Sequence, residues 1–211
     1  MKITITYDNE VFKKGLQADW GFSCFIEAYG KRILFDTGAK GAILLDNLKK
    51  LDIDPLTIDE VVISHDHWDH IDGLPDFLSI NQTKVYIPLS CQTPSGASEI
   101  IRVDESLKIH DNIFSTGELD KFEQSLVVNT EKGLIVIVGC SHPGVKLILK
   151  AASQFGKPYA LVGGLHGFDE FELVKDLRYI CPTHCTQHIS EIKSLYPDKY
   201  IQGGAGQIIE F

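Results

Sequence analysis

The sequence of 211 residues predicts an α/β fold with a mixed β-sheet. Short apolar runs, of the length typical of buried strands, recur from one end of the chain to the other. Between them lie segments whose apolar residues recur every three or four positions, as on one face of a helix. A chain of this length is most simply one domain, 1–211, whose core is large enough to need no disulfide.

The first half of the chain predicts a strand hairpin, then helices and strands in turn. The helix over 41–51 rests on helical spacing of Ile43, Leu44, Leu48 and Leu51. The other expected elements are strands at 3–7, 22–28, 32–35, 61–64 and 84–87, a tight turn at 29–31, and a helix at 73–80.

The second half repeats this logic after a less regular stretch. In 90–116 only short strands near Ile100 and Ile113 are expected. A hairpin follows around 131–133. The remaining elements are strands at 125–129, 134–138, 159–162 and 207–211, and helices at 145–155, 170–177 and 186–195.

Composition narrows the classes of partner. The net charge is −9 and no basic cluster stands out, which argues against nucleic acid because phosphate neutralisation needs lysine or arginine on one face. An anionic small molecule remains possible, since bound divalent metals supply local positive charge. No signal-peptide core and no apolar stretch near the ~20 residues of a membrane span is present, so no membrane partner is expected.

The cysteines point to a reducing compartment. Five cysteines are an odd number, and their spacing does not match a zinc ribbon. We therefore expect a cytoplasmic protein with reduced thiols. The sequence leaves the oligomeric state open.

The run 64–70, Ser-His-Asp-His-Trp-Asp-His, is the most informative stretch of the chain. It follows a continuous apolar strand, and the end of a strand is where sites form in α/β proteins. Buried histidine and aspartate need a partner, and a divalent metal is the natural one. His65, His67, Asp69 and His70 are more ligands than one metal takes from a single loop, which indicates a site shared by two metals.

Two further strand ends carry histidines. His142 follows the strand at 134–138 and precedes a helix that begins near Pro143, so it is expected both to bind metal and to lie beside free N–H groups that suit an anion. His166 stands in a glycine-rich turn and is interpreted as a substrate contact and proton donor, although a plain turn with an exposed histidine fits nearly as well. His110 lacks such a context.

The pattern His-x-His-x-Asp-His resembles the signature of the metallo-β-lactamase superfamily. The hairpin at 22–35 and the Asp36-Thr37-Gly38 turn resemble that superfamily's opening, and the resemblance runs over nearly the whole chain. It implies an αββα sandwich of two mixed sheets flanked by helices. It also implies that His184 is the C-terminal metal ligand and that Asp36 orients a metal-binding histidine. His188, four residues after His184, is expected behind the ligands or on the surface rather than among the ligands.

Two motifs depart from the superfamily's usual hydrolases. No histidine precedes the hairpin in 120–126, and Cys140 stands where a bridging aspartate is expected. Cys140 could coordinate as thiolate, water alone could bridge, or the cysteine could be a small core residue. Gly-Cys-Ser-His at 139–142, Gly-Gly-x-His at 163–166 and Pro-Thr-His-Cys at 182–185 resemble instead a branch of dihydropteroate synthase-like proteins, which includes 7,8-dihydropterin-6-methyl-4-(ribofuranosyl)aminobenzene-5′-phosphate synthase.

These observations predict a metal-dependent hydrolase that uses a metal-activated water on a small, anionic substrate. Two divalent metals are expected, zinc first and iron or manganese as alternatives. The predicted ligands are His65, His67 and His142 for one metal and Asp69, His70 and His184 for the other. Asp69 would also orient the water, and His166 would act in catalysis.

Three alternatives stay open at this stage. The chain could be a pterin-related synthase that displaces diphosphate, or a non-catalytic metal- or ligand-binding domain. Specificity could also be apolar, through Trp20, Trp68 or Phe168, with the glycines serving only tight packing. A glutamate at the second ligand position is typical of diiron relatives, and His67 at that position favours hydrolysis or group transfer.

Overall fold

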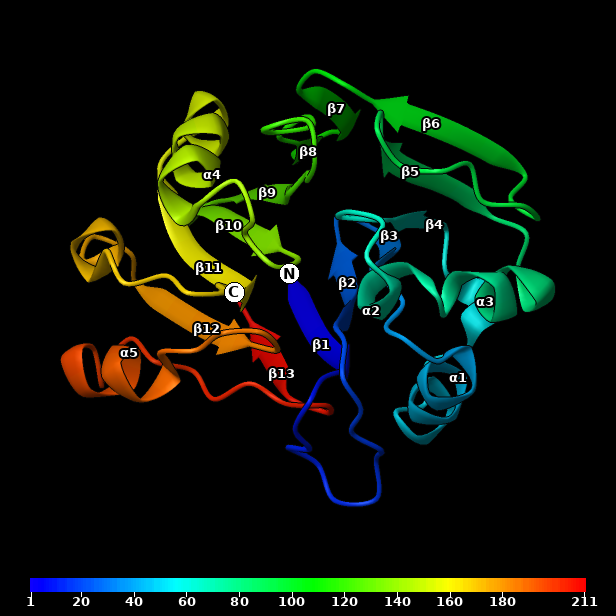
Figure 1. The fold of residues 1–211 in the computed structure, drawn as a ribbon, viewed down its shortest axis with the longest axis horizontal. Coiled ribbons are helices and arrows are strands. Elements are labelled where there is room, and N and C mark those ends of the chain that lie inside the picture. The colour runs from blue at the N-terminus through cyan, green and yellow to red at the C-terminus, as the bar shows by residue number, and fades with distance from the viewer.

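The computed structural model describes all residues 1–211 and contains two β-sheets that face each other, with helices on both outer sides (Figure 1). This is the αββα sandwich that the family resemblance implied. The sheets have seven strands, in the order β13-β1-β2-β3-β4-β5-β6, and six strands, in the order β12-β11-β10-β9-β8-β7.

The seven-stranded sheet changes from antiparallel to parallel at β3. Strands β13, β1, β2 and β3 pair antiparallel, and β3, β4, β5 and β6 pair parallel. Parallel strands point their carboxyl ends to the same edge, so β4 delivers the histidine-rich loop to that edge. The bounds are β1 Lys2–Tyr7, β2 Ser23–Ala28, β3 Lys31–Phe35, β4 Glu60–Val62, β5 Lys84–Pro88, β6 Glu99–Val103 and β13 Ile208–Glu210.

The six-stranded sheet has the same mixed character. Strands β7 to β10 pair antiparallel in sequence order, and β10, β11 and β12 pair parallel. The three parallel strands end beside the loop that follows β4. The bounds are β7 Leu107–His110, β8 Ile113–Ser115, β9 Leu126–Thr130, β10 Gly133–Val138, β11 Pro158–Gly164 and β12 Tyr179–Thr183.

Three apolar clusters hold the layers together. The first, of 20 buried residues, lies between the sheets and draws on strands of both. The second packs α1 (Gly41–Lys50) and α3 (Leu74–Ile80) on the outer face of the seven-stranded sheet, and the third packs α4 (Val145–Ala152) and α5 (Ile189–Leu195) on the other sheet. Burial on both faces explains why a central strand such as β10, Gly-Leu-Ile-Val-Ile-Val, is apolar throughout rather than alternating.

Two predicted helices are wrong in extent. The segment predicted as a helix at 170–177 contains only a 3₁₀ turn, Phe171–Val174. Its apolar residues Phe171, Val174 and Leu177 are three apart, which matches the three residues per turn of a 3₁₀ helix. The helix expected from 186 begins at Ile189 because His184 adopts a positive φ of 48° and the chain turns before the helix can start.

Other differences are small. The helix predicted to reach 155 ends at Ala152 and continues as one 3₁₀ turn, and a short unpredicted helix α2, Trp68–Ile71, forms within the histidine-rich loop. None of the helices is both long and apolar enough to span a membrane.

Candidate metal centre

Six of the eight histidines converge at the edge where the parallel strands of both sheets end. They come from the loop after β4 (His65, His67 and His70), from the loop after β10 (His142), and from the ends of β11 (His166) and β12 (His184). The other two histidines lie elsewhere. His110 pairs with Glu60 and His188 with Glu191, which agrees with leaving both out of the ligand set.

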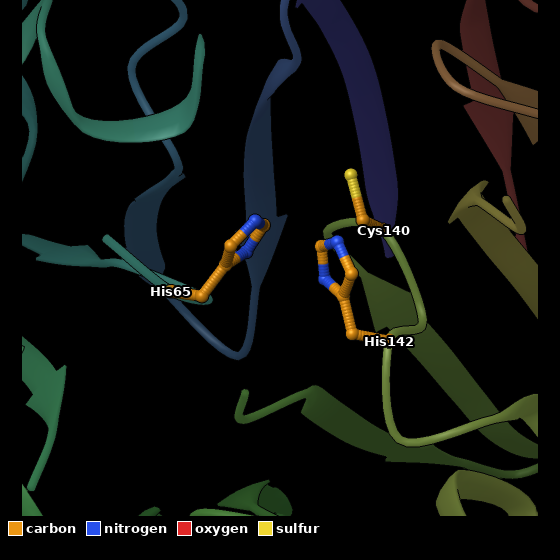
Figure 2. A group of neighbouring side chains, drawn as sticks. All are labelled: His65, Cys140 and His142. Atoms are coloured by element: carbon orange, nitrogen blue, oxygen red, sulfur yellow. The ribbon is translucent and has the colours of Figure 1, made fainter. Parts of the chain in front are cut away.

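The first group is formed by His65, His67 and His142. The ring centroid of His65 lies 4.6 Å from that of His67 and 4.7 Å from that of His142, and the His67 and His142 centroids are 4.9 Å apart. His65 follows a strand of the seven-stranded sheet and His142 follows a strand of the six-stranded sheet, and their rings lie side by side (Figure 2). The structure therefore brings together the three residues predicted as one ligand set.

The second group is formed by Asp69, His70 and His184. Oδ2 of Asp69 lies 3.2 Å from Nε2 of His184, and the His70 and His184 ring centroids are 5.0 Å apart. The two groups adjoin, because the His65 and His70 centroids are 4.2 Å apart. The carboxylate of Asp69 also accepts a hydrogen bond from Trp20 Nε1 at 2.9 Å, which fixes its orientation.

Asp36 and Ser64 orient two of the histidines. The Asp36 carboxylate accepts from His70 Nδ1 at 2.7 Å and from the Ser64 hydroxyl at 2.7 Å, and the Ser64 oxygen in turn accepts from His65 Nδ1 at 2.9 Å. With the ring hydrogens held on Nδ1, the Nε2 atom of each histidine carries no hydrogen and has a lone pair that can bind a metal. This is the contact with a histidine that was predicted for Asp36.

Glu123 orients His142 and was missed by the sequence analysis. One carboxylate oxygen accepts from the backbone N–H groups of Gly139, Cys140 and Ser141, and the other accepts from His142 N and Nδ1, both at 2.9 Å. Burial alone would raise the pKa of Glu123, but the hydrogen bonds from His142 and the loop lower it to about 2. Glu123 is therefore a fully buried anion that holds the loop and the ring together.

Asp8 and Asn9, at the end of β1, orient His184 and were also missed. Nδ1 of His184 donates to Asn9 Oδ1 at 2.9 Å, and the backbone N–H of His184 donates to Asp8 Oδ1 at 3.1 Å. Burial raises the pKa of Asp8 to about 6. Applying the strand-end argument to β1, as to β4 and β10, would have found this polar pair, whereas no local pattern marks Glu123.

Two ring nitrogens at the centre have no hydrogen-bond partner in the protein. Nε2 of His65 and Nε2 of His184 are both buried and make no hydrogen bond, although Nε2 of His184 lies 3.2 Å from the Asp69 carboxylate. Burial lowers the pKa of His65 well below its ordinary value and that of His70 to about 3, so both rings are neutral at pH 7. Buried polar atoms without partners are rare in folded proteins, and a neutral imidazole lone pair is the form that binds metal.

Cys140 lies between the two groups. Its sulfur is 3.1 Å from His70 Nε2, and it falls within 4.8 Å of the ligand atoms of His65 and His142 on one side and of His70 and His184 on the other. A third set joins Cys140 with His166 and Cys185 at the same spacing. The interaction of the two neighbouring thiols raises the pKa of Cys140 and lowers that of Cys185 to about 6.

His166 stands at the mouth of the centre. Its ring centroid is 4.9 Å from that of His142, its side chain is exposed, and its backbone takes a positive φ of 49°. This position suits the predicted contact with a substrate. The exposed indole of Trp20 lies between β1 and β2, and that of Trp68 lies in α2, within the loop after β4. Phe168 is buried in the core beneath α4 and cannot line a substrate pocket.

One premise of the anion prediction is wrong. The loop before α4 was expected to offer free N–H groups, but those of Ser141 and His142 donate to Glu123, and that of Gly144 donates to the Ser141 carbonyl. Pro143 has no N–H to offer. An internal carboxylate therefore already occupies the position proposed for a substrate anion in this loop.

The fold and the site together define a class: a two-sheet sandwich with a histidine-rich centre at the edge where the parallel strands end. The chain belongs to the metallo-β-lactamase superfamily, whose family model matches residues 21–190. Members of this superfamily usually bind divalent metals, and the groups described above are candidate ligands for them.

Comparison with individual proteins supports the same branch as the sequence motifs. The chain is 26% identical to 7,8-dihydropterin-6-methyl-4-(β-D-ribofuranosyl)-aminobenzene-5′-phosphate synthase of Methanocaldococcus jannaschii, over 99% of this chain and 95% of the relative. It is also 26% identical to Tm1679, a metal-dependent hydrolase of the β-lactamase superfamily, with a TM-score of 0.82 over 100% of this chain and 99% of that one. YhfI of Bacillus subtilis shares the fold, with 13% identity and a TM-score of 0.71 over 99% of both chains.

Proposed function

We propose that the chain is a metal-dependent hydrolase with two divalent metal ions, zinc first. His65, His67 and His142 would hold one ion, and Asp69, His70 and His184 the other. The observation that carries this proposal is that the buried Nε2 atoms of His65 and His184, one in each group, make no hydrogen bond; that of His184 faces the Asp69 carboxylate, another proposed ligand, at 3.2 Å. A lone pair buried without a donor costs free energy unless a ligand occupies the space in front of it.

The buried charges of the centre support the same proposal. Asp8, Asp36, Asp69 and Glu123 are all buried, and no lysine or arginine forms an ion pair with any of them. Burying several carboxylates is expensive unless cations balance them. Two divalent cations would supply that balance.

The hydrogen bonds around the ligands fit metal binding as well. Histidine ligands in metal sites donate their second N–H to a carboxylate or carbonyl oxygen, which fixes the tautomer and the ring orientation. Asp36, Glu123 and Asn9 accept such hydrogen bonds from His70, His142 and His184. Cys140 is the candidate for a bridging ligand, because its sulfur lies between the two groups.

When bound, two metals lower the pKa of a coordinated water to about 7 and so supply a nucleophile at neutral pH. The residues of this chain would do the rest. Asp69, fixed by Trp20, would bind and orient the water, and His166 would donate a hydrogen bond or a proton to the substrate from the open side. We expect a small anionic substrate, drawn by the metals and His166 rather than by the loop before α4.

A second candidate, a synthase that displaces diphosphate from a dihydropterin substrate, is favoured by the 26% identical relative that carries a synthase name. The metals would then hold the diphosphate leaving group. A non-catalytic metal- or ligand-binding domain is the third.

Metal analysis tests the centre. Purified without chelator, the wild-type protein is expected to carry up to two divalent metals per chain, and His65→Ala/His67→Ala fewer. His188→Ala, which removes a surface histidine paired with Glu191, is the matched control and should leave the metal content unchanged. Equal metal content in the double variant and the wild type would contradict the assignment of His65 and His67 as ligands.

A substrate screen separates the three functions. Turnover of simple phosphodiesters, lactones or thioesters by the metal-loaded protein would support the hydrolase. Release of diphosphate from a pterin diphosphate only when an arylamine is present would support the synthase and overturn the hydrolase. A protein that stays empty after incubation with Zn²⁺, Mn²⁺ or Fe²⁺ would leave only the binding domain.

A further inference from the structure

Three neighbouring parallel strands are each followed by a residue that can bind a metal. Cys140 follows β10, His166 follows β11 and Cys185 follows β12, and these strands are adjacent in the sheet. The two sulfurs and the nearest His166 nitrogen all lie within 4.8 Å of one another. Neither His166 nor Cys185 belongs to the two groups proposed to hold the metals above.

Gly164 makes room for this group. A Cβ atom at position 164 would lie 2.7 Å from Cys185 Sγ and 2.5 Å from the Gly139 carbonyl oxygen. Any side chain there would collide with the Cys185 sulfur and with the backbone of the loop after β10. The absence of a side chain at the end of β11 therefore lets the cysteine after β12 reach across to the loop after β10.

The two cysteines are free thiols, and their spacing allows a shared metal. Two thiolates on one tetrahedral zinc ion, with Zn–S distances of about 2.3 Å, lie roughly 3.8 Å apart. A disulfide requires the sulfurs to approach to about 2.05 Å. Sulfurs within 4.8 Å, with an imidazole nitrogen in the same triangle, need little movement to close on a metal.

We propose that Cys140, His166 and Cys185 form a third metal position, which takes a soft or borderline cation such as Zn²⁺ or Cd²⁺. The position rests on the proposed function only in that it shares the Cys140 sulfur with the two-metal centre. A thiolate can bind two neighbouring cations, so with the third position filled Cys140 would join that ion to one ion of the two-metal centre instead of bridging the two. Metal-bound imidazole keeps one N–H, and His166 can still donate to a substrate.

The position is open to solvent on one side. Cys140 is buried, Cys185 is half-buried and His166 is exposed, so an ion enters past the histidine. Cys2His is also a ligand set known from protein zinc sites that keep a fourth position for water or substrate.

Titration of the metal-free protein with Co²⁺ tests the proposal, because thiolate ligands give a sulfur-to-cobalt charge-transfer band that histidine and carboxylate ligands do not. We expect Cys185→Ser to bind one Co²⁺ fewer per chain than the wild type and to lose the part of the band that Cys185 contributes. Cys91→Ser, at a buried cysteine in the cluster beneath α1 and α3, is the matched control and should keep both. Circular dichroism checks that each variant is folded.

Two results would overturn the third position. One is an unchanged cobalt stoichiometry and band in Cys185→Ser, combined with complete loss of the band in Cys140→Ser, which would leave Cys140 as a bridging ligand alone. The other is a wild-type protein whose mass shows Cys140 and Cys185 joined as a disulfide. On the wild type itself, Cd²⁺ should protect both cysteines from alkylation, as mapped by peptide mass spectrometry.

The His65→Ala/His67→Ala variant tests the two-metal centre separately from the third position. In His65→Ala/His67→Ala the thiolate band should persist while the total cobalt falls. If the double variant binds as much cobalt as the wild type, the two-metal assignment fails and the third position stands. A wild-type protein that binds cobalt without the thiolate band would also overturn the third position, and would leave only the histidine and Asp69 ligands of the two-metal centre.

Discussion

At the scale of single residues, the centre depends on side chains that would not touch a substrate. Asp36, Glu123 and Asn9 each hold one histidine by its Nδ1 hydrogen, and Glu123 also binds the backbone of the loop that carries Cys140. Such partners set the tautomer and direction of a ligand, so their loss weakens metal binding even though the ligands remain.

We expect Glu123→Gln to lower the affinity for Zn²⁺ by about 10–100-fold, the range found when carboxylates behind histidine ligands are replaced. The amide loses the charge that holds His142 and the N–H groups of the loop. Competition with a chromophoric chelator measures the affinity. Glu118→Gln, at a carboxylate that accepts from Ser90 instead, is the control and should bind zinc like the wild type.

The pH dependence of the metal-free protein should report the same carboxylate. The pKa of Glu123 is lowered from 4.5 to about 2 in the folded protein, so its stabilising contribution is complete above pH 4.5 and is lost as the pH falls towards 2. The contribution is on the order of 3 kcal/mol. Urea unfolding of wild type and Glu123→Gln should give free energies that differ at pH 6 and converge as the pH falls below 4.5. A constant difference over that range would show that the buried group is not ionised.

At the scale of elements, the parallel strands β10, β11 and β12 bring the ligands together, and glycines at the end of β11 allow the close approach. Gly163 has a φ of 130°, and a Cβ there would run into the Val138 carbonyl of β10. The glycines thus serve both the tight packing that was one reading of the sequence and the placement of Cys185.

Gly163→Ala should destabilise the metal-free protein by about 3 kcal/mol, because it adds a clash with β10 to the cost of a positive φ. Gly30→Ala is the matched control. Gly30 also has a positive φ, of 74°, but a Cβ there meets nothing within 4 Å, so only about 1–2 kcal/mol should be lost. Denaturant unfolding compares the two, and equal losses would remove the clash from the account.

The site residues that the sequence predicted are marked by local pattern, whereas those that it missed take their role from contacts between distant segments. The loop 64–70, His142 and His184 stand directly after apolar strands, so local pattern and spacing reveal them. Glu123 lies in an irregular stretch, and its role arises only when β9 and β10 bring it under the loop at 139–142. The helix expected at 170–177 failed because a spacing of three suits a 3₁₀ turn as well as a helix.

At the scale of the whole molecule, the proposed ligands come from both sheets. His65, His67, Asp69 and His70 belong to the seven-stranded sheet and His142 and His184 to the six-stranded one. Ions bound there would connect the two halves of the sandwich at one edge. Metal binding should therefore stabilise the entire fold and not only the loops, since ligand binding to the native state adds to the free energy of unfolding.

At 100 times the dissociation constant of the metal, this addition is about 2.7 kcal/mol, which for a chain of this size corresponds to a rise in Tm of roughly 5–10 °C. Chelator-treated protein should show the lower Tm and recover it with Zn²⁺. His65→Ala/His67→Ala should show a smaller rise. A Tm that does not respond to metal would separate the centre from the stability of the sandwich.

The split of the ligands along the chain also has a consequence for the order of folding. Four of the six proposed ligands lie before residue 71, but their partners come after residue 141, and the strands that present those partners pair only within the second sheet. A chain that is still being synthesised can offer the first loop alone, with too few rigidly placed donors for a pair of ions. Both ions can therefore bind only after the two sheets have packed together, so the metal centre forms last and joins two sheets that are already in place.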